Sequence, residues 1–78
     1  MKTMTCLQLG GACDEKFRAE TFEEMAELSR KHGMAMFEKQ DAAHLNAMNK
    51  MKAMMGEPGK MEAWFEAKKQ EFAALADD

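Results

Sequence analysis

Hydrophobic and polar residues alternate at the start of the chain and then change to a helical period. The segment Thr3-Met4-Thr5-Cys6-Leu7-Gln8-Leu9 has the two-residue alternation of a β-strand. Gly10-Gly11 follows as a turn signal, and the residues from Cys13 to Ala19 would form the returning strand. This pattern predicts a β-hairpin over residues 3–19, which must pack on a helix because a lone hairpin is marginal in water.

A first helix is predicted over residues 21–39. Thr21 is its expected N-cap, and Glu24 completes a capping box with it. Gly33 could end this helix, but the apolar stripe continues past it, so we expect one continuous helix. The stripe on its core-facing side is Met25, Leu28, His32 and Met36.

Two further helices are predicted over residues 42–55 and 59–75, separated by Gly56-Glu57-Pro58-Gly59. Asp41 is the expected N-cap of the first of them. Their apolar stripes are His44, Met48, Met51 and Met55, and then Met61, Trp64, Phe65, Phe72 and Leu75. The fold class is therefore α+β: an N-terminal β-hairpin packed on a mostly helical body of three helices, in a single domain over residues 1–78.

The composition argues against nucleic-acid and membrane partners. The net charge is −3 and no basic patch offsets the acidic residues, so we expect no nucleic-acid partner. The apolar runs are far shorter than a membrane span, and the start has no apolar core of a secretory signal, so we expect no membrane partner and a cytoplasmic location. In that compartment Cys6 and Cys13 would be thiols or metal ligands.

The chain contains ten methionines, an unusual number for 78 residues. Methionine fills irregular gaps, so the plain interpretation is core filling along the helix stripes. The other interpretation is a surface that repacks against a partner, because methionine specifies shape weakly. On that interpretation the chain would form a homo-oligomer through the methionine and aromatic faces of its helices.

Two cysteines and one histidine form the candidate site. With Gly10-Gly11 at the centre of the turn, Gln8 lies opposite Cys13 and Cys6 lies opposite Glu15. The cysteines are then diagonal neighbours on one face, with backbones roughly 7–8 Å apart. That distance is long for an unstrained disulfide but suits two thiolates on one metal. A register shift of one turn residue would place them directly opposite and allow a disulfide.

His32 lies on the stripe that faces the hairpin, so Cys6, Cys13 and His32 are the candidate metal ligands, with zinc as the candidate ion. The fourth ligand stays open among Asp14, Glu15, a water and a residue of a second chain. His44 is expected to be a partly exposed histidine outside the site. The alternative is that the cysteines are small buried hydrophobic residues and that the protein is a helical interaction module without metal.

Two other chemistries fit less well. Thiol redox activity would favour a Cys-x-x-Cys spacing or a cysteine at a helix N-terminus, and neither cysteine has either. Copper(I) suits sulfur ligands, but the methionines lie on stripes that need burial. No serine-nucleophile, P-loop or dinucleotide motif is present, so we expect a non-enzymatic protein.

Several short motifs follow one another in the N-terminal half of the chain. They are Met4-Thr5-Cys6, Leu9-Gly10, Cys13-Asp14, Phe17, Glu20-Thr21, Glu23-Glu24 and His32-Gly33. In their order and spacing, over roughly residues 4–34, they resemble the family DUF1059, whose members are described as predicted small metal-binding proteins of unknown function. The resemblance implies a Cys…Gly…Cys segment before a capped helix that ends near His-Gly, and a metal-binding role.

Overall fold

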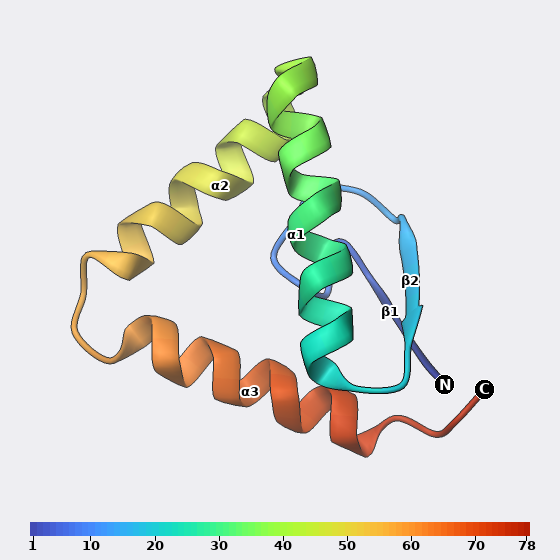
Figure 1. The fold of residues 1–78 in the computed structure, drawn as a ribbon. Helices are drawn as coiled ribbons and strands as arrows, with labels where there is room; N and C mark the ends of the chain where they lie inside the picture. Colours follow the sequence, from blue (N-terminus) through green and yellow to red (C-terminus); the bar gives the residue numbers. More distant parts are fainter.

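The computed structural model describes all residues, 1–78, and has the predicted α+β organisation. A two-stranded antiparallel sheet comes first and three helices follow it (Figure 1). The elements are β1 (Lys2–Thr5), β2 (Lys16–Ala19), α1 (Phe22–Lys39), α2 (Ala42–Met55) and α3 (Lys60–Ala74).

The hairpin keeps the predicted register but has shorter strands than predicted. Thr5 lies opposite Lys16, and the backbone N–H of Cys6 donates to the carbonyl of Glu15 at 2.8 Å, which continues that register by one pair. The predicted tight turn at Gly10-Gly11 is wrong, because residues 6–15 form a ten-residue loop. The loop curls because the N–H of Leu9 donates back to the carbonyls of Thr5 and Cys6. Leu9 is therefore buried by a turn of the chain and not by strand pairing.

The three helices lie within one or two residues of their predicted spans. Thr21 caps α1 by accepting a hydrogen bond from the N–H of Glu24, and Asp41 caps α2 in the same way. α1 runs through Gly33 without a break, as predicted. It ends where Gln40 adopts the left-handed conformation, from which its N–H bonds to the last carbonyls of the helix.

The helices form the sides of an open triangle, with the sheet against α1 (Figure 1). The molecule is flat, with principal extents of 33 × 30 × 15 Å. The chain ends lie side by side: the N–H of Asp78 donates to the carbonyl of Met1, and the Lys2 ammonium donates to the carbonyl of Phe72. These bonds hold the C-terminal end of α3 against β1. None of the three helices combines the length and the apolar character that a membrane span requires.

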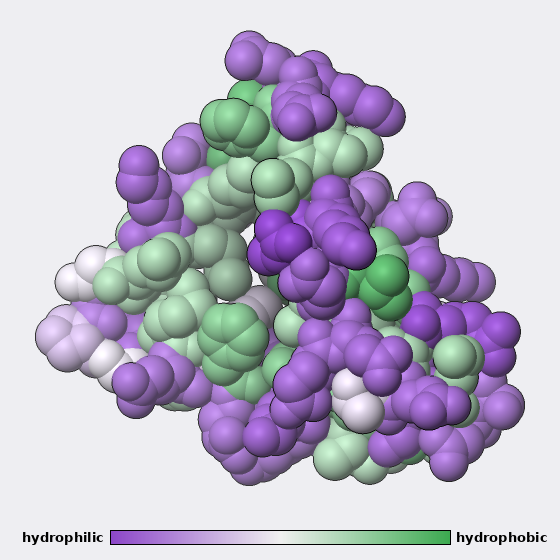
Figure 2. Space-filling view, in the orientation of Figure 1, coloured by the Kyte–Doolittle hydropathy of each residue, from purple (hydrophilic) through white to green (hydrophobic).

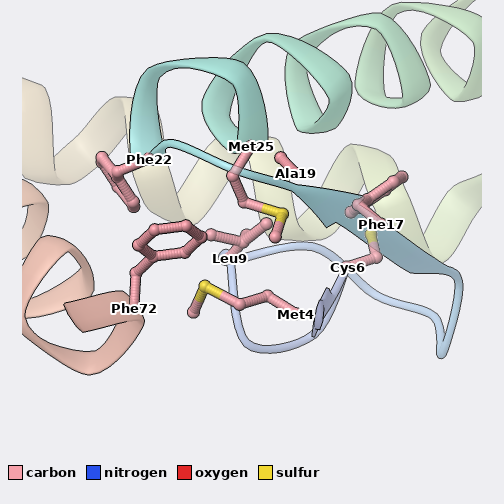
Figure 3. Close-up of a cluster of buried hydrophobic side chains, with 8 residues drawn as sticks. All are labelled: Met4, Cys6, Leu9, Phe17, Ala19, Phe22, Met25 and Phe72. Atoms are coloured by element: carbon pink, nitrogen blue, oxygen red, sulfur yellow. The ribbon is translucent and has the colours of Figure 1, made fainter. Parts of the chain in front are cut away.

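The core lies between the sheet, the loop and the start of α1, and only Phe72 joins it from the later helices (Figure 3). Met4 and Met25 are its most fully buried large side chains. Other methionines lie outside it, and Met55 is 67% exposed. The predicted stripe of α1 is buried only at its start, since Leu28 is exposed. The core residues are Met4, Cys6, Leu9, Phe17, Ala19, Phe22, Met25 and Phe72.

Candidate metal centre

Four side chains of types that can ligate a metal ion meet between the loop, α1 and α2. One ligand atom from each of Cys6, Cys13, His32 and His44 lies within 4.8 Å of all the others. The structure thus brings together the three candidate ligands of the sequence analysis and adds a fourth. The two sulfur atoms come from the loop, and the two imidazoles come from the middle of α1 and the first turn of α2.

Two of the sulfur–nitrogen distances are close to those of a tetrahedral site. Cys13 Sγ lies 3.2 Å from His32 Nε2, and Cys6 Sγ lies 3.6 Å from His44 Nε2. With Zn–S near 2.3 Å and Zn–N near 2.0 Å, two ligands at a tetrahedral angle are separated by about 3.5 Å. Small side-chain movements would therefore place all four atoms at bonding distance from one ion.

The backbone of the loop passes close to the Cys6 sulfur. The Cys6 carbonyl accepts hydrogen bonds from the N–H groups of Leu9, at 3.1 Å, and Gly11, at 2.7 Å. A Cβ atom at Gly11 would lie 2.1 Å from Cys6 Sγ, so only glycine allows the backbone to pass this close to the thiol. Gly11 serves this close approach, while Gly10 has a positive φ of 89° and lies against Trp64, so neither glycine forms the two-residue turn that the sequence suggests.

Backbone hydrogen bonds stabilise a thiolate at Cys6. Burial alone raises the pKa of the Cys6 thiol, but the N–H of Cys13, the His44 side chain and the N–H of Ala12 together outweigh burial and lower the pKa. The N–H of Glu15 lowers the pKa of Cys13, but burial and the neighbouring Cys6 thiolate outweigh it and raise the pKa. The first proton therefore leaves from Cys6, and a cation at the centre would favour loss of the second.

Asp41 orients the His44 ring. Its Oδ2 atom accepts from the backbone N–H of His44 at 3.0 Å and lies 2.6 Å from His44 Nδ1. The hydrogen bond to Asp41 raises the pKa of His44, while burial opposes the rise and Cys6 adds to it. Because Nδ1–H is directed to the carboxylate, Nε2 faces the sulfur atoms and carries the lone pair once the ring is neutral. A carboxylate behind a metal-ligating histidine is a common arrangement in metal sites.

Aromatic packing holds His32 in place. Its ring makes a T-shaped contact with the Phe17 ring, at a centroid distance of 5.5 Å, and another with the His44 ring, at 5.3 Å. Phe17 is a buried residue of β2, so the sheet supports the imidazole from the side. Both imidazoles thus reach the centre in orientations that their neighbours fix.

The expectation for His44 was wrong. Instead of being partly exposed, His44 is only 5% exposed and is the one polar residue in the buried set. Asp14 and Glu15, two of the candidates for the fourth ligand, are exposed and do not belong to the cluster. The cysteines are not joined in a disulfide. The signal that could have identified His44 is the Asp-x-x-His spacing of Asp41 and His44 at a helix start, which lets one carboxylate reach both the backbone and the ring of the histidine.

No family model, no curated protein and no solved structure matches this chain. The resemblance to DUF1059 therefore stays a prediction.

Proposed function

We propose that the chain binds one divalent transition-metal ion, zinc in the first place, through Cys6, Cys13, His32 and His44. The observation that carries the proposal is the convergence of two sulfur and two imidazole nitrogen atoms within 4.8 Å, from three separate parts of the chain. Two cysteines and two histidines are a ligand set typical of structural zinc.

The role that fits this site is structural. Four protein ligands fill a tetrahedral ion and leave no position for a substrate, unlike the three ligands and open position of catalytic zinc. Two of the ligands, Cys6 and His44, are buried. The ion would join the N-terminal hairpin to α2, which contributes no other residue to the buried set.

Zinc fits better than copper(I), the other ion that sulfur ligands suit. Copper(I) favours thiolates and thioethers, whereas the atoms gathered here are two thiol sulfurs and two imidazole nitrogens. The methionines of α2 and α3 lie instead along the helix faces. A thiol redox function would use the same two cysteines but gives no reason for both imidazoles and Asp41 to surround them.

Native mass spectrometry of the chain purified without added metal or chelator tests the proposal. We expect one zinc ion per chain, lost in Cys6→Ser and in His44→Gln, and retained in the matched controls Asp14→Asn and Glu15→Gln. Thermal unfolding should shift to lower temperature with a strong chelator, since an ion at one thousand times its Kd stabilises the folded state by about 4 kcal/mol.

Three outcomes would overturn the proposal. They are a metal-free chain whose unfolding temperature is unchanged by chelator, a zinc ion retained in His44→Gln, and a loss of zinc in the Glu15→Gln control. A mass lower by two hydrogen atoms, from a Cys6–Cys13 disulfide in freshly purified protein, would favour the thiol redox function instead. A bound copper ion under the same conditions would keep the site but change its metal.

A further inference from the structure

The chain exposes more surface than a monomer of its mass. Only nine of its 78 residues are buried, and the accessible surface is 5422 Å². Monomeric proteins follow a scaling of surface with mass that gives roughly 4,800 Å² for a chain of this size. The flat shape of the molecule and the open centre between the three helices both contribute to this excess of roughly 600 Å².

Apolar side chains gather around that centre. A hollow of about 300 Å³ lies between the three helices and is lined by nine residues, eight of them hydrophobic. Figure 2 shows this region as a depression bordered by apolar surface. Met55 is 67% exposed and Phe65 is 46% exposed there. We call this surface the inner helix face, and its main residues are Phe22, Met51, Met55, Met61, Trp64 and Phe65.

We propose that the inner helix face is the contact between two copies of this chain, related by a two-fold axis. A dimer that buries roughly 800 Å² on each partner would remove an area of the same order as the roughly 600 Å² excess of the whole chain. Methionine, tryptophan and phenylalanine are enriched in the buried centres of such interfaces. The inner helix face brings together three methionines, the single tryptophan and two phenylalanines.

The charges at the edge of this face favour a second copy over a foreign partner. A two-fold contact places the same patch on both sides, so each patch must complement itself. Glu62, Glu66 and Lys69 lie beside Met61 and Phe65, and Lys50 lies beside Met51. The border thus carries both signs, as self-complementarity requires. Of the four candidate metal ligands, none lines the hollow, so the proposal does not depend on the proposed metal function.

Sedimentation velocity of the full chain over a range of concentrations tests the proposal. We expect a species of twice 8.8 kDa that dissociates on dilution. Trp64 is the only tryptophan, so its emission should shift to shorter wavelength as the dimer forms. Met55→Glu and Phe65→Glu should each raise the dimer Kd by about thirty-fold or more, the effect of losing a central interface residue.

Phe37→Glu is the matched control. Phe37 is 59% exposed on α1, and the groove that it lines shares no residue with the inner helix face. It should leave the dimer Kd unchanged. Phe65 also contacts Phe22, so Met55→Glu, at a more exposed position, gives the decisive result if Phe65→Glu unfolds the chain.

The proposal fails if the wild-type chain stays monomeric at millimolar concentration, if its dimer is insensitive to Met55→Glu, or if Phe37→Glu dissociates it. It also fails if native mass spectrometry finds a monomer that carries an apolar small molecule, because the hollow would then be a ligand site. None of these results changes the zinc stoichiometry, so failure here and failure of the metal proposal are distinguishable.

Discussion

The two halves of the chain bury their residues very differently. Residues 1–25 supply seven of the eight core residues, whereas α2 and α3 together supply one, Phe72. Apart from Phe72, the only buried residue of these two helices is His44. The N-terminal half is a small core with its own sheet, and the C-terminal half is a helical arm that contributes two buried side chains to it.

The two attachment points differ in chemistry. Phe72 inserts an aromatic ring beside Phe22 (Figure 3), with ring centroids 5.9 Å apart. The Phe72 carbonyl accepts a hydrogen bond from the Lys2 ammonium at 3.1 Å. His44 brings an imidazole to the cysteines of the loop. The Phe72 attachment is mainly hydrophobic and needs no ion, whereas the His44 attachment would be completed by a metal ion. We therefore expect the arm and the core to respond differently to mutations of similar chemistry.

The largest expected effect comes from removing the hydrophobic attachment. Phe72→Ala should lower the free energy of unfolding by about 3–5 kcal/mol, the usual cost of deleting a buried phenylalanine. Because the arm has few other buried contacts, hydrogen exchange should accelerate in α3 more than in β2. Phe37→Ala, at an exposed site, is the control and should change stability by less than about 0.5 kcal/mol. Uniform acceleration in both halves would show that the arm and the core unfold as one unit.

Two methionine substitutions, one in the core and one in the arm, compare how much each half contributes to stability. Met25→Ala removes a side chain that is 0% exposed and should cost about 2–5 kcal/mol. Met48→Ala in α2 removes a half-buried side chain and should cost about 1 kcal/mol or less. Urea unfolding of both variants in the presence of saturating zinc measures the difference. Equal losses would contradict the division into a dense core and a loosely packed arm.

The elements of this fold could be predicted because their signals are local. The cap at Thr21, the cap at Asp41 and the break after Met55 each depend on a few adjacent residues, and the helix bounds follow from them. The loop could not be predicted in the same way. The alternation through Cys6 and Leu9 fits a strand equally well, and only the close approach of Gly11 to the Cys6 sulfur distinguishes the curled loop.

The candidate site could be predicted only in part, for a physical reason. Cys6, Cys13 and His32 belong to neighbouring elements, so strand register and helix face were enough to bring them together. His44 approaches from a third element, and its position depends on the angle at which α1 turns into α2 near Gln40. Its place in a methionine stripe favours ordinary packing, and the carboxylate three residues before it indicates only a cap.

Substitution of Asp41 has the smallest expected effect, and it tests the attachment through His44 without removing a candidate ligand. Asp41→Ser keeps a good N-cap for α2 but removes the carboxylate beside His44 Nδ1, and Asp41→Asn keeps the cap and a neutral acceptor. Loss of such a carboxylate lowers metal affinity by about 10- to 100-fold. We expect that range for Asp41→Ser and a smaller loss for Asp41→Asn, in competition titrations with a chelator of known affinity.

Asp14→Asn, at an exposed carboxylate beside Cys13, is the control and should leave the metal affinity unchanged. Unchanged circular dichroism with weaker metal binding would identify Asp41 as a positioning residue for His44, because both variants keep the N-cap and lose only the carboxylate. Unchanged affinity in Asp41→Ser would instead reduce Asp41 to a helix cap.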